Sequence, residues 1–204
     1  MTEIVKKNST LTLPLVALRD IVIYPRMTVN LDIGRKDSIA AVRFASKGDQ
    51  YVVTAMQKDA AIGNPEADDL YRVGTVVNIN QILQLPGGLI RILAEGVSRV
   101  NIFSITATDH GFSAEVDDLK ETPVADESKA EAYRRTILKS FFEWLRNTKQ
   151  GLPDDQMKQL KLITDPGKTA DFISAQLLIT PKRRQDLLEE TDIMTRLQMV
   201  QRLL

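Results

Sequence analysis

The chain has 204 residues, of which 43% are hydrophobic and 26% are charged, a balance typical of a globular protein. Basic and acidic residues number 27 each, so the formal net charge is zero and no nucleic-acid partner is expected. The sequence contains no cysteine for disulfides or thiolate metal sites and no apolar run approaching the roughly 20 residues that span a membrane, which favours a cytoplasmic protein without membrane contact.

The segment between residues 13 and 27 carries the most distinctive pattern. Two apolar runs, LPLVAL and IVIYP, are separated by Arg19 and Asp20. We interpret the pattern as a strand, a charged corner and a second strand, with the two charged side chains paired to fix the corner. A functional role for the Arg-Asp pair is the alternative interpretation.

Short β-branched runs broken by glycine, proline and aspartate continue to about residue 119, which predicts a mainly β region. Strands are predicted over 51–56, 73–79, 98–106 and 112–119, with a helix over about 36–46. Apolar residues on both sides of Pro86-Gly87-Gly88 predict a hairpin between Leu83 and Leu93. The tripeptide Asp109-His110-Gly111 predicts another turn.

After residue 120 the apolar period changes to that of a helix, as in Tyr133, Ile137, Phe141 and Trp144. Prolines at 153, 166 and 181 mark helix starts, so about five helices are predicted. The last covers 192–204 and carries a heptad-like apolar stripe without a terminating glycine or proline. This pattern favours a segment of a longer helix; an ordinary helix packed on its own bundle is the alternative. The stripe consists of Ile193, Leu197, Val200 and Leu204, our candidates for contacts between subunits.

Several blocks resemble the N-terminal substrate-recognition domain of Lon, the bacterial ATP-dependent serine protease. Residues 13–27 are similar to the opening signature of that family, and Gly34-Arg35 is similar to the segment before its first helix. The blocks VGTV at 73–76, LPGG at 85–88 and EGVSR at 95–99 follow in the family's order. Ala17 and Gly87 depart from the proline and aspartate that the family often has at these positions.

The resemblance implies an α+β fold, with a β-rich PUA-like subdomain over 1–120 and an all-α helical bundle over 121–204. It also implies a noncatalytic region that recognises unfolded, damaged or tagged proteins and supports a homohexamer. Alternatives are a mainly oligomerising element and a stand-alone adaptor or ligand-binding protein of the same domain family. The family's ATP, Mg and serine-protease chemistry belongs to modules outside this sequence, so no cofactor is expected here.

The residues give no complete catalytic, nucleotide or metal site. Residues 165–169, DPGKT, match only the end of a phosphate-binding loop, because Leu162 replaces its first glycine and Pro166 lacks a backbone donor; we predict a helix start instead. His110 is the only histidine and lies in a predicted turn. We therefore assign no catalytic residue and no metal ligand.

Recognition of unfolded chains needs exposed apolar groups with adaptable contacts. Apolar side chains at predicted turns and strand ends are the candidates, although core packing is the favoured role for most of them. The candidates are Tyr24, Pro25, Met27, Leu85, Pro86 and Leu89.

Overall fold

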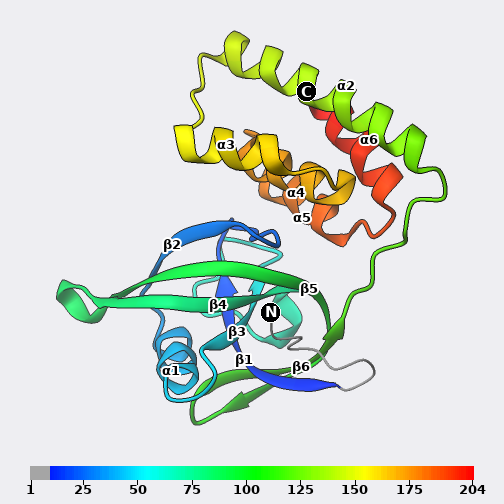
Figure 1. Ribbon diagram of the computed structural model, residues 1–204. Helices are drawn as coiled ribbons and strands as arrows, with labels where there is room; N and C mark the ends of the chain where they lie inside the picture. The colour runs from blue at the N-terminus through cyan, green and yellow to red at the C-terminus, as the bar shows by residue number, and fades with distance from the viewer. Residues whose placement is uncertain (1–9) are drawn as a thin grey trace. The chain divides into compact units, whose positions relative to one another are not determined.

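The computed structural model describes residues 10–204, which fall into a β-rich unit that ends at Leu119 and a helical unit, Lys120–Leu204 (Figure 1). The predicted boundary after residue 120 lies one residue from this division. Strands occur in the first unit and only helices in the second, in agreement with the predicted α+β class. The assignment of the first unit as PUA-like stays a prediction.

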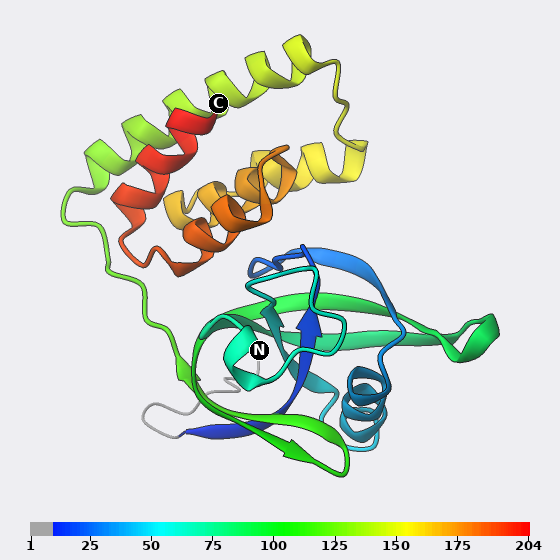
Figure 2. The same cartoon turned by 180° about the vertical axis from the view of Figure 1, so that it is seen from behind.

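The β-rich unit is built on one six-stranded sheet with the order β2-β5-β4-β3-β1-β6. Because β6 also pairs with β5, five of the strands close into a ring, which is visible from behind in Figure 2. The strands are β1 (Leu11–Leu18), β2 (Thr28–Ile33), β3 (Tyr51–Met56), β4 (Val73–Gln84), β5 (Ile90–Thr108) and β6 (Gly111–Asp118), with helix α1 (Lys36–Ala45) between β2 and β3.

The long strand β5 closes the ring because its two ends serve different partners. Residues 90–95 pair with β2, and residues 100–108 pair with β6. Register shifts follow Val76 and Ile79 in β4 and Ile102 in β5. Such bulges bend a strand and increase its twist, which lets a 19-residue strand curve around the barrel.

The barrel has an open seam at β1 and β2. β6 pairs with β1 only from Leu11 to Leu15, whereas β3 pairs with β1 from Leu15 to Leu18. β2 pairs only with β5 among the described strands. Residues 16–18 of β1 therefore have a ladder partner on one side only, and so does the whole of β2.

Residues 19–27, which we call the signature loop, do not form the predicted second strand. The loop turns at Asp20, whose φ of 57° is left-handed, and regular structure resumes only at Thr28. No ion pair joins Arg19 to Asp20 among the described residues, so the predicted salt-bridged corner is also wrong. The positive φ of Asp20 makes the corner instead.

Contacts with β4 and β5 hold the signature loop in place. The Thr75 hydroxyl donates to the Ile23 carbonyl at 2.5 Å, and the Arg26 N–H donates to the Gly96 carbonyl at 2.7 Å. A Cβ on Gly96 would lie 2.1 Å from the Tyr24 carbonyl oxygen, so only glycine fits where the loop crosses β5. The loop therefore satisfies its backbone groups without a strand partner.

The helical unit contains the five predicted helices. They are α2 (Glu127–Thr148), α3 (Asp154–Leu162), α4 (Pro166–Gln176), α5 (Pro181–Glu189) and α6 (Ile193–Leu203). Side chains of Asp126, Asp165, Thr180 and Asp192 accept hydrogen bonds from the first turns of α2, α4, α5 and α6. DPGKT is thus a helix start, as predicted. No helix within residues 10–204 combines the length and apolar character that crossing a membrane requires.

A buried arginine ties the helical unit together. Arg196 on α6 is fully buried; it donates to the Glu190 carbonyl at 2.9 Å and to the Glu121 carboxylate. Its Nε also lies 3.3 Å from the buried Asp171 carboxylate on α4. A buried charge is tolerated only when it is paired and hydrogen-bonded, so this network fixes α6 against α4 and the start of the unit.

We predict that Gly96→Ala lowers the free energy of unfolding of the β-rich unit by about 3 kcal/mol, because the new methyl group collides with backbone rather than with a flexible side chain. Urea unfolding monitored by hydrogen exchange of β5 amides gives the value. Gly48→Ala is the control, since a Cβ there meets nothing closer than 3.8 Å. Equal stability of the two variants would contradict the prediction.

Candidate functional site

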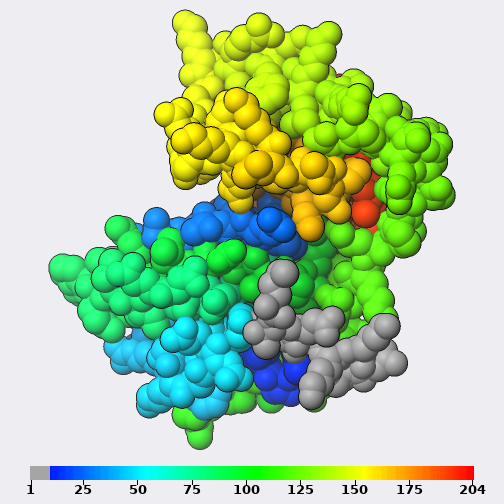
Figure 3. Space-filling model, viewed as in Figure 1, coloured from blue at the N-terminus to red at the C-terminus, as the bar shows by residue number. Residues whose placement is uncertain are grey.

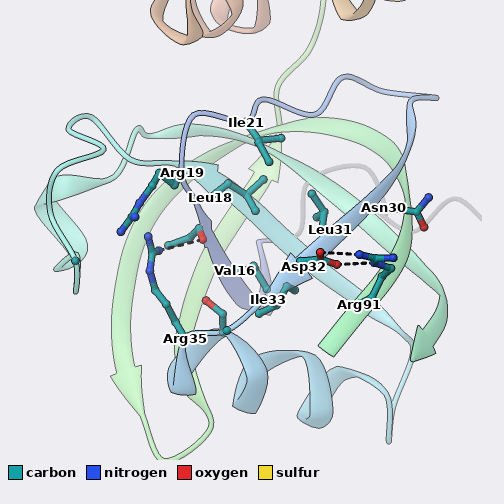
Figure 4. A pocket seen from close by; sticks show the side chains of 14 residues that line it. Val16, Leu18, Arg19, Ile21, Asn30, Leu31, Asp32, Ile33, Arg35 and Arg91 are labelled. Carbon is teal, nitrogen blue, oxygen red and sulfur yellow. Dashed lines mark hydrogen bonds and ion pairs between the residues drawn. The ribbon is translucent and has the colours of Figure 1, made fainter. Parts of the chain in front are cut away.

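A pocket of about 530 Å³ lies at the open seam of the barrel. The end of β1 and most of β2 form its walls, and the signature loop and the start of α1 complete them (Figure 4). The residues that line it are Val16, Ala17, Leu18, Arg19, Ile21, Asn30, Leu31, Asp32, Ile33, Gly34, Arg35, Ser38, Gly63 and Arg91. Two sequence blocks that resemble the Lon family, residues 13–27 and Gly34-Arg35, thus meet in one cavity.

The floor of the pocket is apolar. Val16 and Leu18 come from β1, and Leu31 and Ile33 come from β2, where the period of two places both on the core side. All four are no more than 6% exposed, whereas Ile21 in the signature loop is 37% exposed. A ligand in this pocket would therefore contact packed aliphatic side chains at the floor and the exposed side chain of Ile21 at the rim.

Two arginines occupy one side of the pocket, and in Figure 4 their side chains extend toward each other. The Arg35 guanidinium donates to the Ala17 carbonyl at 3.3 Å and to the Gln57 side-chain oxygen. The Arg19 guanidinium donates to the Ile62 carbonyl at 3.5 Å, and the Gln57 amide donates to the same carbonyl at 2.9 Å. Gln57, which is 3% exposed, therefore connects both arginines to one loop.

Neither Arg19 nor Arg35 has a carboxylate partner within residues 10–204. Burial lowers the pKa of Arg35, and the nearby positive charge of Arg19 lowers it further. Both effects mean that the charged form of Arg35 is less stable here than in water. An anion in the pocket would relieve that cost.

The opposite side of the pocket is electrically balanced. Arg91 on β5 holds Asp32 on β2 through two hydrogen bonds of 2.6 and 2.7 Å, drawn in Figure 4. The hydrogen bonds from Arg91 hold the pKa of Asp32 below its usual value of 3.8. Asp32 and Arg91 are directly opposed in the β2–β5 ladder, so this pair also contributes a favourable cross-strand contact to the pairing of the two strands.

The predicted substrate-binding residues of the signature loop do not lie on an open surface. Tyr24 is 1% exposed, so the prediction of an accessible Tyr24 is corrected: its ring is part of the core. Pro25 and Met27 are half-buried, and Met27 packs against the core cluster around β2. The neighbouring Ile21 is the accessible apolar residue of the loop, and the sequence analysis did not select it.

The predicted residues of the β4–β5 hairpin are more accessible. Leu85 is half-buried, Pro86 is exposed and Leu89 is 41% exposed. Leu83, at 47%, adds an exposed leucine that was not predicted. The hairpin extends from the barrel in Figure 1, and its tip protrudes in Figure 3. Gly87 and Gly88 turn the tip with φ of 77° and 81°, as the predicted hairpin requires.

The stripe on the last helix is mainly core. Leu197 and Val200 are 0% exposed, so they pack inside the helical unit and are not available for contacts between subunits. Ile193 and Leu204 are half-buried. The alternative of a helix packed on its own bundle therefore describes these two central positions correctly, because the heptad-like spacing faces the unit's own core.

A second pocket, of about 450 Å³, lies beside α1. Lys36, Arg43 and Lys47 give it a basic lining, and His110 stacks on Phe44 with 4.5 Å between ring centroids. His110 thus lies in the predicted turn, where its ring covers an exposed aromatic side chain. No cluster of three or more potential metal ligands occurs among residues 10–204.

Comparison with known proteins identifies the family. The family described as "ATP-dependent protease La (LON) substrate-binding domain" matches residues 12–204. The chain belongs to the Lon substrate-binding domain family. Lon protease of Clostridium acetobutylicum is 37% identical over 188 residues, and Lon protease of Escherichia coli strain K12 is 33% identical over 193 residues. These matches cover 92% and 95% of the chain but 24% of each relative, so the chain spans about a quarter of their length.

Solved structures of Lon N-terminal domains share the fold. The N-terminal domain of Mycobacterium avium complex Lon protease aligns with a TM-score of 0.76 at 19% identity, covering 93% of this chain and 96% of that one. A Lon N-terminal domain protein from Xanthomonas campestris aligns with a TM-score of 0.66 at 17% identity, covering 94% and 98%. At such low identity the two structures support the fold only.

Sequence analysis of this Lon-family domain assigned no site role to the pocket residues Asp32, Arg35 and Arg91, or to Gln57, which accepts a hydrogen bond from Arg35. Their roles arise from strands that meet across the barrel, and sequence spacing does not show such meetings. One available signal was Gln57, a polar residue directly after the apolar strand 51–56. A polar side chain at the end of a buried strand needs a partner, and here the partner is Arg35.

We predict that Arg91→Gln raises the pKa of Asp32 toward 3.8, because it removes the cation that stabilises the carboxylate. Carbon-13 NMR titration of the Asp32 carboxyl measures this shift. Since the folded pKa is the lower one, the pair's contribution to stability is present above the unfolded pKa and is lost as the pH falls. Arg72→Gln, which breaks the exposed pair with Asp68, should leave the pKa of Asp32 unchanged. An unchanged pKa of Asp32 in Arg91→Gln would contradict the assignment.

Proposed function

We propose that the chain binds extended apolar segments of unfolded, damaged or tagged proteins at the seam pocket, and so selects substrates for a Lon-type protease. The observation that carries the proposal is the combination, in one pocket, of an aliphatic floor with two strand edges that lack ladder partners. An extended peptide could offer main-chain groups to these edges and side chains to the floor.

Family membership supports substrate binding in general, and the pocket supports this particular location. Aliphatic contacts discriminate little between sequences, which suits clients that have apolar exposure in common rather than one chemical group. The tip of the β4–β5 hairpin offers a second apolar surface through Leu83 and Leu89. Two separate weak contacts on one client would raise its residence time through effective concentration.

In the longer protein that its relatives exemplify, we propose that this region works beside modules that bind ATP and Mg and cleave the peptide bond. The proposed setting is a cytoplasmic homohexamer, in which several copies would present their pockets to one client. The chain itself would contribute binding and no catalytic group.

We expect Ile21→Thr to weaken binding of a fluorescein-labelled, unstructured, leucine-rich peptide by about fivefold, because a ligand on the floor would cover this side chain. Fluorescence anisotropy gives the Kd. Val97→Thr is the matched control, since Val97 is also 37% exposed and lies outside the pocket. Equal Kd values for Ile21→Thr and the unmodified protein would argue against the seam pocket as the binding site.

We also propose that exposed leucines of the helical unit support assembly. Leu162 at the end of α3 is 81% exposed, and Leu178 after α4 is 72% exposed. Burial of these two side chains in a partner would remove their apolar surface from water, which is favourable in free energy. They replace the buried Leu197 and Val200 as the candidates for contacts between subunits.

The double variant Leu162→Ser/Leu178→Ser should raise the dissociation constant for self-association at least about tenfold, since two leucines lose their burial. Sedimentation equilibrium measures the constant. Phe103→Ser removes a 59% exposed aromatic from the other unit and serves as the control. If the double variant associates as the unmodified chain does, another surface carries assembly.

A further inference from the structure

We propose that the seam pocket binds the free C-terminal carboxylate of a client chain whose last residue is apolar, with Arg19 and Arg35 holding the carboxylate and the aliphatic floor holding the last side chain. This inference rests on the proposed function, because it names the part of an unfolded protein that enters the pocket. It would make the pocket selective for chain ends.

The arginines provide the first step of the argument. Arg35 uses two of its five N–H donors within residues 10–204, one on the Ala17 carbonyl and one on Gln57. Arg19 makes a single long contact with the Ile62 carbonyl. Both cations line the same pocket without a carboxylate partner among the described residues. An arriving anion therefore finds open donors and two uncompensated positive charges.

The remaining charges of the pocket do not compete for the anion. Asp32 is the carboxylate among the lining residues, and Arg91 engages both of its oxygens. Figure 4 places this pair across the pocket from Arg19 and Arg35. The excess positive charge is thus confined to one side, where guanidinium groups can form charge-assisted, bidentate hydrogen bonds with a carboxylate.

The floor indicates what is attached to the anion. Leu18, Leu31 and the rim residue Ile21 provide aliphatic surface next to the cationic side. A C-terminal residue carries its carboxylate and its side chain on the same Cα, so one residue can satisfy both sides of the pocket. Inorganic phosphate would satisfy the arginines and leave the aliphatic surface in water.

The size of the pocket also favours a chain end. A volume of about 530 Å³ is in the range of sites that enclose small ligands. A terminal residue needs one exit for the preceding chain, whereas an internal aspartate or glutamate needs space for the chain on both sides. Backbone capture of chain termini is an established mode of peptide recognition, and here side chains would supply the charge.

The experiment compares three unstructured peptides with the full chain by fluorescence anisotropy. The first ends in leucine with a free carboxylate, the second is its C-terminal amide, and the third ends in glycine with a free carboxylate. We expect the leucine acid to bind about tenfold more tightly than the amide, the effect of losing one charge-assisted contact of about 1.4 kcal/mol. The glycine acid should be weaker as well, because it leaves the floor empty.

Two variants connect this preference to the arginines. Arg19→Gln should reduce the advantage of acid over amide to about threefold or less, and because Arg19 is exposed the substitution should leave the fold intact. Arg35→Lys keeps the charge but loses the planar fork, so it should also reduce the advantage while hydrogen exchange of the β5 amides, in the same unit as Arg35, stays unchanged. Arg43→Gln, in the second pocket, should leave the advantage intact.

Each contrary outcome has a distinct meaning. Equal binding of acid and amide, both weakened by Ile21→Thr, would overturn the carboxylate inference and leave the proposed function standing. If neither the leucine acid nor its amide binds, the seam pocket is removed from both proposals. Inorganic phosphate and N-acetyl-leucine can each be tested as competitors of the leucine acid. If phosphate displaces the peptide as effectively as N-acetyl-leucine does, the floor contributes nothing to binding, which would overturn the apolar part of the inference.

Discussion

The close approach of the signature loop to β5 determines most of what the β-rich unit offers its surroundings. Gly96 has no side chain, and the Tyr24 carbonyl occupies the space that a Cβ would take. Backbone hydrogen bonds between Gly96 and Arg26 and between Gly96 and Met27 then fix the loop across the strand. This crossing holds the loop in a shape that a regular strand could not adopt, with Ile21 and Arg19 at the seam and Tyr24 in the core.

The pocket is a consequence of that crossing. If residues 21–24 had continued as a strand, they could have paired with a neighbour and filled the open side of β1. The chain instead leaves β1 at Asp20, and the side chain of Arg35 reaches back to the Ala17 carbonyl. A backbone carbonyl at the seam is therefore hydrogen-bonded by a side chain, and a side chain can exchange partners more easily than a paired strand can. Such an edge combines stability with access for a ligand.

The sequence was most informative where local chemistry decides the structure. The hairpin at Pro86-Gly87-Gly88 and the helix start at Asp165-Pro166 follow from turn and capping chemistry, and both were predicted. Burial was harder to predict. Tyr24 was named as a candidate for exposure because it lies at a predicted strand end, whereas its position is decided by Gly96, more than seventy residues later in the chain.

The site shows the same division between local and distant information. Arg19 and Gly34-Arg35 were noticed as parts of two separate blocks, but their convergence depends on the order of strands in the barrel. Gln57 accepts a hydrogen bond from Arg35 and donates one to the Ile62 carbonyl, to which Arg19 also donates. The sequence gives no local signal for this role except the place of Gln57 after a buried strand. Leu197 was misjudged for a related reason, since an apolar stripe does not state whether its partner is the same chain or another copy.

The closure of the ring also constrains how this unit can fold. Strand β1 pairs with β6, so that Leu11 lies opposite Val116, and the barrel cannot close until residues about one hundred positions apart have met. Contacts of such long sequence separation slow folding, because the entropy of loop closure is lost before the contacts form. During synthesis, the early strands would wait for β6 to leave the ribosome, whereas each helix of the second unit can form from neighbouring residues. The β-rich unit is thus the kinetic bottleneck of the chain.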